Sequence, residues 1–131
     1  MQRINIILKF LLEITSIWEL IVIFLLIGKL TIGNNVTLAS RVTIIDHSHG
    51  KLDETDIDVP VMERALISKG PIYIADNVWI GEGAVILGGI SIGKNSVIAA
   101  NAVVTRDIPS NTVAAGVPAR PIKTITKSDK V

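Results

Sequence analysis

Residues 74–109 read IADNVW, IGEGAV, ILGGIS, IGKNSV, IAANAV and VTRDIP when they are divided into sixes. The first position of each six is Ile or Val without exception, and the fifth position is always small or branched. A hexapeptide period is typical of a parallel β-helix, in which each six supplies one strand and one turn and three sixes close a triangular coil. The first-position residues, predicted to point into the prism, are Ile74, Ile80, Ile86, Ile92, Ile98 and Val104. The fifth-position residues, predicted to lie near the corners, are Val78, Ala84, Ile90, Ser96, Ala102 and Ile108.

The fourth position of each six is expected to form a corner. Asn, Gly and Asp tolerate left-handed backbone angles, which a sharp corner requires. The fourth-position residues are Asn77, Gly83, Gly89, Asn95, Asn101 and Asp107. Six sixes in one register are a poor match to an ordinary run of buried strands, so the sequence predicts an all-β solenoid.

The composition fits this prediction and excludes some classes of function. The chain has 131 residues, enough for one domain, and it is 49% apolar but only 4% aromatic, as a core of stacked Ile and Val would be. The net charge is +1, without a basic stripe that interleaves aromatic residues, so we expect no nucleic-acid partner. The absence of cysteine excludes disulfides and thiolate metal sites, and it fits a cytoplasmic location.

The repeat extends towards the N-terminus, and we assign residues 31–109 to the β-helix. Further first-position residues are Ile32, Leu38 and Ile44. Thirty residues, or five sixes, separate Ile44 from Ile74, so the register survives an interruption over about residues 49–71. This polar interruption predicts a loop extruded from one corner, and loops of such length in a compact domain are usually functional. Residues 110–131 form a separate C-terminal segment and tail.

Residues 1–30 are apolar and carry no clear hexapeptide repeat. Polar residues recur at intervals of three or four, which favours a helix packed against the end of the solenoid or against a neighbouring subunit. Glu13 and Glu19 argue against a transmembrane span, because an acidic group at mid-bilayer costs about 2.5–3.5 kcal/mol. Two alternatives are peripheral membrane contact through residues 4–27 and degenerate coils of the solenoid. Residues 20–27 are richer in Ile and Val and could form a strand.

The segment from Asn77 to Lys123 resembles the C-terminal half of the hexapeptide-repeat acyltransferases. Its motifs NVWIG, AVVTRDIP and AAGVPAR together are most similar to the maltose and galactoside O-acetyltransferase branch and to the capsule and lipopolysaccharide O-acetyltransferases. The resemblance covers residues 31–123 and implies a left-handed β-helix, a homotrimer, acetyl-coenzyme A as the donor and no required metal. It also implies a coenzyme groove between adjacent prisms and a histidine general base.

The resemblance places the coenzyme contacts on seven residues. Two small residues would let the pantetheine arm approach the backbone, two cations would neutralise phosphates, and an indole would form a flat wall beside the thioester. These residues are Trp79, Glu82, Ala99, Ala100, Thr105, Arg120 and Lys123. A corner-packing role for the indole and a solvated basic tail are the structural alternatives.

The only two histidines, His47 and His49, stand where the repeat gives way to the loop. An imidazole suits the removal of a proton from an acceptor hydroxyl that attacks a thioester. Alignment without a gap places His49 on the family's catalytic histidine, whereas a shift of two residues places His47 there. The other histidine would then orient the base or contact the acceptor. The candidate carboxylates that would hold the base or contact the acceptor are Asp46, Asp53 and Glu54.

The sequence leaves the acceptor open. The resemblance favours transfer of an acetyl group to a hydroxyl of a sugar or surface-polysaccharide precursor, but the same donor and base would serve N-acetylation of an amino-sugar nucleotide. The upstream coils that usually bind the acceptor are replaced here by residues 4–27. A non-catalytic β-helix scaffold is a further alternative. A zinc-dependent carbonic anhydrase of similar fold would need three histidine ligands, and this chain has two.

Overall fold

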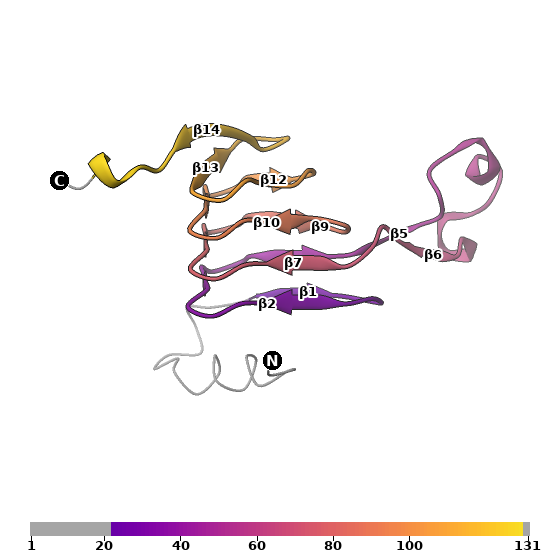
Figure 1. Ribbon diagram of the computed structural model, residues 1–131. Coiled ribbons are helices and arrows are strands. Elements are labelled where there is room, and N and C mark those ends of the chain that lie inside the picture. Colours follow the sequence, from indigo (N-terminus) through magenta and orange to yellow (C-terminus); the bar gives the residue numbers. More distant parts are fainter. Residues whose placement is uncertain (1–21, 130–131) are drawn as a thin grey trace.

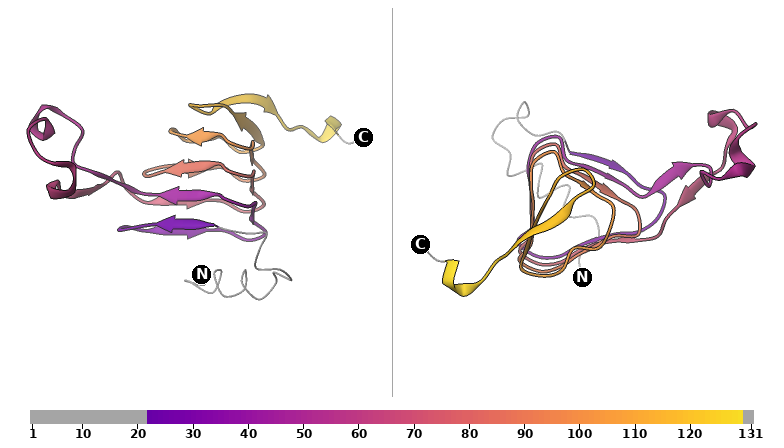
Figure 2. Two further views of the ribbon diagram at one scale, coloured as in Figure 1. Left: turned by 180° about the vertical axis from the view of Figure 1, so that it is seen from behind. Right: turned by 90° about the horizontal axis from the view of Figure 1, so that it is seen from above.

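The computed structural model describes residues 22–129, which form a stack of coils with a triangular outline when viewed along the stack (Figures 1 and 2). The strands are short, and turns join them at the corners. They are β1 (Ile23–Leu25), β2 (Leu30–Ile32), β3 (Thr37–Leu38), β4 (Thr43–Ile45), β5 (His47–His49), β6 (Leu66–Ser68), β7 (Ile72–Ile74), β8 (Trp79–Ile80), β9 (Val85–Leu87), β10 (Ser91–Ile92), β11 (Val97–Ile98), β12 (Val103–Val104), β13 (Thr112–Ala115) and β14 (Arg120–Thr124). Single 3-10 turns occupy Glu54–Asp56 (η1), Val61–Glu63 (η2) and Lys127–Asp129 (η3).

Three sheets form the faces of the prism. We call them sheet A (order β1-β4-β9-β12), sheet B (β2-β7-β10) and sheet C (β3-β8-β11-β13-β14). Successive coils pair in parallel, and equivalent residues lie eighteen apart where the repeat is regular, as in the Ile80–Ile98 pair. This arrangement confirms the predicted all-β solenoid and is consistent with a left-handed β-helix.

The core is the column of residues that the hexapeptide pattern predicted. All six first-position side chains of residues 74–109 are completely buried, and no fifth-position residue is more than 5% exposed. Burying one such aliphatic side chain contributes about 1.5–3 kcal/mol, so the stacked Ile and Val column supplies much of the driving force for folding.

Most of the predicted corner residues adopt left-handed backbone angles. The φ angle is positive at Asn77, Gly83, Gly89, Asn95 and Asn101, as expected. Asp107 is the exception, and its carboxylate instead accepts a hydrogen bond of 2.8 Å from the backbone N–H of Ser91. No named strand forms there, and the backbone pairing with the preceding coil is reduced to the isolated Ile92–Ile108 bridge. The hexapeptide pattern alone does not reveal this change of turn.

The β-helix begins before the boundary that we placed at residue 30. Strand β1 pairs in parallel with β4, and Phe24 lies opposite Ile44. Ile23–Leu25 therefore form a strand, in agreement with the strand considered for residues 20–27 and with the alternative of degenerate coils. These residues pair with the edge of sheet A while Phe24 packs against the core. Phe24 precedes Ile44 by twenty residues, so the turn after β1 departs from the regular spacing. The helix expected within residues 1–30 is not formed over residues 22–30, and residues 1–21 lie outside the described residues.

Residues 46–70 form the extruded loop, which we call the arm. Its base is the antiparallel pair β5 and β6, and its tip carries η1 and η2 (Figure 1). At the far end of the stack, β14 folds back antiparallel on β13 and continues sheet C, so the predicted C-terminal segment is joined to the prism. Viewed along the stack, the arm and the end of β14 point in different directions (Figure 2).

Candidate functional site

Both histidines lie at the point where the arm leaves the prism. Strand β5 follows β4 with only Asp46 between them, so His47 and His49 are placed by the end of sheet A. In the antiparallel pairing, His47 lies opposite Ser68 and His49 opposite Leu66. The alternation of a strand directs side chains two residues apart to the same face, as the sequence indicated.

Asp46 is the hub of this region. Its side chain is completely buried, and its carboxylate oxygens accept hydrogen bonds from the backbone N–H groups of Ile27 (3.0 Å) and Gly28 (2.6 Å). The Oδ1 atom also lies 3.1 Å from Nδ1 of His47. Burial would raise the pKa of Asp46, but the hydrogen bonds from Ile27, His47 and Gly28, together with the attraction of the His47 ring, hold that pKa below its ordinary value of 3.8. Asp46 is therefore an ionised carboxylate at neutral pH.

His49 has a different environment. Its Nδ1 atom is buried and has no hydrogen-bond partner among the described residues. A buried polar nitrogen without a partner costs about 1–3 kcal/mol, so a hydrogen-bond partner at this nitrogen would be stabilising. The following residue, Gly50, has a φ of +84°, and its Cα lies against the carboxylate of Asp56, which accepts the Leu52 N–H at 2.6 Å. Gly50 thus turns the chain into the arm immediately after the histidine.

Two of the predicted carboxylates lie elsewhere. Asp53 caps η1, where it accepts hydrogen bonds from the backbone N–H (2.9 Å) and the hydroxyl (2.5 Å) of Thr55, and these bonds lower its pKa. Glu54 is exposed in the same turn. Within residues 22–129, Asp46 is the one carboxylate that hydrogen-bonds to a histidine ring. Asp53 and Glu54 are thus not brought to the imidazoles within the chain.

Six of the seven predicted coenzyme residues lie on sheet C or at the corner beside it; Thr105 is the exception. Trp79 lies on β8 and is 55% exposed, so it is not a buried corner residue. The Ala99–Ala100 turn packs closely on the coil beneath it, since a Cβ added to Gly81 would come within 2.6 Å of the Ala100 nitrogen. Glu82 lies on that same side, where it forms an exposed 2.8 Å ion pair with Arg41. Arg41 has a φ of 58° at its corner, and no sequence signal pointed to this residue.

The remaining predicted contacts are distributed around the prism. Thr105 follows β12 at the corner from which the arm leaves, two coils further along the stack. Arg120 and Lys123 are exposed on β14, and Arg120 donates a hydrogen bond of 2.9 Å to the carbonyl of Ala119. The two cations belong to sheet C, whereas the histidines follow the end of sheet A, and the arm and the end of β14 point in different directions (Figure 2).

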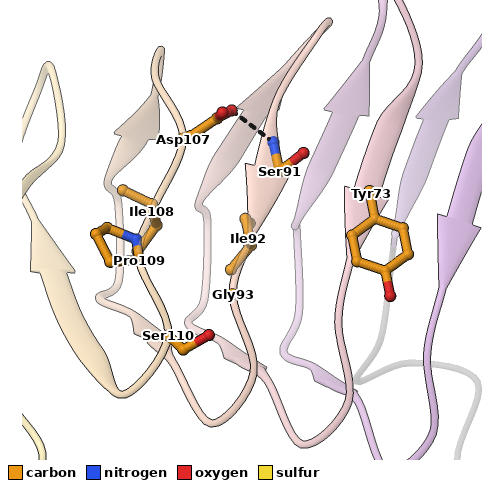
Figure 3. Close-up of a pocket in the computed structure, with 8 residues that line it drawn as sticks. All are labelled: Tyr73, Ser91, Ile92, Gly93, Asp107, Ile108, Pro109 and Ser110. Carbon is orange, nitrogen blue, oxygen red and sulfur yellow. Dashed lines mark hydrogen bonds between the residues drawn. The ribbon is translucent and has the colours of Figure 1, made fainter.

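A shallow depression of about 350 Å³ lies on sheet B (Figure 3). It is lined by Tyr73, Ser91, Ile92, Gly93, Asp107, Ile108, Pro109 and Ser110. None of the predicted site residues is among them. The depression therefore does not mark the histidine site. Within residues 22–129, no group of three or more His, Asp or Glu side chains is placed to hold a metal ion.

Stacked hexapeptide coils with one extruded arm define the class of this protein as a hexapeptide-repeat β-helix. The family model "Bacterial transferase hexapeptide (six repeats)" matches residues 71–106. The galactoside O-acetyltransferase of Escherichia coli is 45% identical over 76% of this chain and 46% of that protein. A candidate lipopolysaccharide-biosynthesis O-acetyltransferase of the same organism is 40% identical over 80% of this chain and 55% of that protein.

The structural comparison agrees with these matches. A galactoside acetyltransferase solved in complex with coenzyme A superposes with a TM-score of 0.74 and 42% identity, over 83% of this chain and 52% of that one. Over its repeat, this chain is similar in sequence and in fold to hexapeptide-repeat acetyltransferases. It spans about half the length of the curated relatives that it matches. Within residues 22–129, no helix is both long and apolar enough to cross a membrane.

Proposed function

We propose that this protein transfers the acetyl group of acetyl-coenzyme A to a hydroxyl of a sugar or of a surface-polysaccharide precursor. The observation that carries the proposal is the pair of histidines at the root of the arm, on a β-helix whose relatives include a galactoside acetyltransferase in complex with coenzyme A. A sugar hydroxyl is a weak nucleophile at neutral pH, and a positioned imidazole overcomes this weakness by accepting its proton.

The reaction needs only proton transfers and one acyl transfer. The unprotonated imidazole nitrogen accepts the hydroxyl proton while the sugar oxygen bonds to the thioester carbonyl carbon. The resulting tetrahedral intermediate collapses, the carbon–sulfur bond breaks, and the imidazolium returns the proton to the coenzyme thiolate. The products are the sugar ester and free coenzyme A, and the histidine is regenerated.

We assign the base to His49, in agreement with the ungapped alignment, and keep His47 as the alternative. For Nε2 of His49 to accept a proton, Nδ1 must carry the hydrogen, and that nitrogen is buried without a hydrogen-bond partner among the described residues. An acceptor contributed by a second copy would complete the site. His47 differs because its Nδ1 atom already has a hydrogen-bond partner, the carboxylate of Asp46.

The coenzyme would lie along sheet C and the neighbouring corners. Trp79 supplies an exposed aromatic face, and the Ala99–Ala100 turn offers a surface without long side chains. Arg120 and Lys123 supply two exposed cations for the coenzyme phosphates. Glu82 and Thr105 complete the proposed set. The Arg41–Glu82 ion pair would border the coenzyme groove.

A homotrimer would bring the two halves of this site together. The arm and β14 diverge within one chain, so a histidine and a phosphate-binding cation that serve one coenzyme come from different copies. The outward-facing side of sheet A favours such packing because it is apolar: Ile23 and Leu25 are 42% and 46% exposed, and Val85, Leu87 and Val103 continue the face. Thr43 and Ile45 complete the face, and none of its strand positions in the described part of the chain is charged.

The test is a mass-spectrometric screen for a mass gain of one acetyl group. The purified full-length protein is incubated with acetyl-coenzyme A and, in parallel, with sugars, nucleotide sugars, amino-sugar nucleotides and lipid-linked oligosaccharides. An acetylated hydroxyl that forms only with active protein supports the proposal, whereas an acetylated amine would assign N-acetylation. Failure to bind coenzyme A in calorimetry would replace both with the scaffold alternative.

A further inference from the structure

Three aspartates of this fold connect one coil to the coil before it. Asp76 accepts the Asn34 N–H at 2.8 Å, Asp107 accepts the Ser91 N–H at 2.8 Å, and Asp46 accepts the N–H groups of Ile27 and Gly28. In each case a turn carboxylate satisfies a backbone donor that the sheet ladder leaves unpaired. All three aspartates therefore make the same kind of contact between coils, and this contact alone does not distinguish Asp46.

Asp46 differs from the other two in burial and in its third partner. Its side chain is completely buried, whereas Asp107 is exposed and Asp76 is partly buried. It also contacts the Nδ1 atom of His47 at 3.1 Å. An ionised carboxylate can only accept hydrogen bonds, so this contact requires the proton of a neutral His47 ring to reside on Nδ1.

The space around Asp46 is shaped by two glycines from different coils. A Cβ at Gly28, in the coil below, would lie 2.8 Å from the Asp46 Oδ2 atom. A Cβ at Gly88, in the coil above, would lie 2.6 Å from the Asp46 carbonyl oxygen. Neither glycine has a positive φ, so the backbone conformation does not require glycine there. The close approach of Asp46 does, because it leaves no room for a Cβ.

We infer that Asp46 is a positioning residue of the site, which couples the Ile27–Gly28 turn to His47 and holds the His47 ring in its Nδ1–H tautomer. Nε2 is then the unprotonated nitrogen of that ring, able to accept a hydrogen bond from an acceptor hydroxyl beside the base. The turn after β1, which sequence reasoning placed outside the β-helix, thereby becomes part of the catalytic apparatus. A role in catalysis rests on the proposed acetyltransferase function, whereas the Asp46–His47 contact and the tautomer that it selects do not.

The experiment reads the tautomer directly. Long-range proton–nitrogen NMR spectra of the full-length protein, labelled with nitrogen-15 in histidine, report which ring nitrogen is protonated. Spectra are recorded under mildly alkaline conditions, where histidine is ordinarily neutral. The chain has only two histidines, so His49→Gln assigns the signals. We expect the wild-type His47 ring to show a protonated Nδ1 and an unprotonated Nε2, and an Nε2–H tautomer would overturn the inference without any variant.

Two variants test the coupling and two matched variants control for it. Asp46→Asn removes the acceptor-only carboxylate, and Gly28→Ala crowds it from the coil below while every polar group is kept. Both should shift the His47 nitrogen signals towards the Nε2–H tautomer. Asp76→Asn and Gly33→Ala make the same changes at another corner, where a Cβ on Gly33 would overlap the Asp76 carboxylate, and should leave those signals unchanged.

Unchanged His47 signals in a folded Asp46→Asn or Gly28→Ala protein would overturn the inference. Equal shifts in the control pair would also overturn it, because they would mark a general loosening of the coils. Acetyl transfer is measured on the same samples, and Asp46→Asn should lower kcat while coenzyme affinity is retained. If the wild type acetylates nothing but shows the expected tautomer and coupling, the proposed function fails and the positioning contact stands.

Discussion

At the scale of single residues, the two histidines are chemically distinct although they lie on one short strand. Asp46 holds the Nδ1 atom of His47, whereas the Nδ1 atom of His49 is buried without a partner among the described residues. The sequence placed both at the boundary between the repeat and the loop but could not rank their environments. The difference comes from Asp46, the neighbour of His47, whose carboxylate also accepts hydrogen bonds from a turn about twenty residues earlier in the chain.

Replacement of His49 by Ala should lower turnover by about 10²–10⁴-fold, the usual contribution of a general acid–base group. Coenzyme affinity should barely change, because the imidazole acts on the acceptor hydroxyl. His47→Ala, the matched variant, should cost less. Acetyl transfer and calorimetric coenzyme binding are measured for both. A dead His47→Ala enzyme beside an active His49→Ala enzyme would move the base to His47.

The ionised state of Asp46 should contribute to stability in a pH-dependent way. Its pKa in the folded protein is below the ordinary 3.8, so the unfolded chain binds the proton more readily. This contribution is fully present above the ordinary pKa and is lost as the pH falls through the folded pKa. Thermal unfolding followed from pH 7 into the acid range should show a smaller loss of stability for Asp46→Asn than for the wild type. Parallel curves would show that Asp46 does not contribute.

At the scale of elements, the coils are held by a column of identical aliphatic side chains and by short corner turns. Side-chain amides add a second set of contacts at one corner, where Asn77 donates to Asn95 at 2.9 Å and Asn95 donates to Asn111 at 2.8 Å. The arm interrupts this regularity without breaking it, since β4 and β9 on either side of it pair directly. The arm is therefore an addition to a complete prism.

Ile86→Ala should destabilise the protein by about 2–5 kcal/mol, because the side chain is completely buried between β4 and β12 and its loss leaves a cavity. The exposed Ile122 on β14 provides the control, and Ile122→Ala should change stability by less than about 0.5 kcal/mol. Denaturant unfolding measures both. A similar cost for the two variants would contradict the assignment of the core.

Strand β14 carries the cations assigned to the coenzyme phosphates. Arg120→Ala should weaken coenzyme binding by about 1–3 kcal/mol, the range for a lost charge-assisted contact, with little effect on the fold because Arg120 is exposed. Titration calorimetry with coenzyme A measures the change. Lys127→Ala, in η3 beyond β14, is the matched control for the loss of one positive charge. Unchanged affinity in Arg120→Ala would remove this residue from the site.

At the scale of the whole molecule, the proposed site is divided between two parts of the chain, the arm and β14. The arm with the histidines and β14 with the cations leave the prism in different directions (Figures 1 and 2). Sedimentation at micromolar protein concentration should therefore show a trimer, with the apolar face of sheet A covered. Leu25→Glu would place a charge on that face and should shift the equilibrium to monomer with loss of activity, whereas Tyr73→Glu on sheet B should not. A monomeric, active wild type would contradict the shared site.

The sequence by itself determined the repeat, the inward-facing columns, most of the corners, the extruded arm and the family resemblance. Those features are local: each six carries its own strand and turn, and a period of six needs no distant partner to be recognised. Only the tertiary structure decided that Ile23–Leu25 joins sheet A, that Asp107 forms a different turn, and that Asp46 serves His47 while Asp53 caps η1. These outcomes depend on which backbone donors and strand edges the neighbouring coil leaves unpaired, and stacking alone brings such partners together.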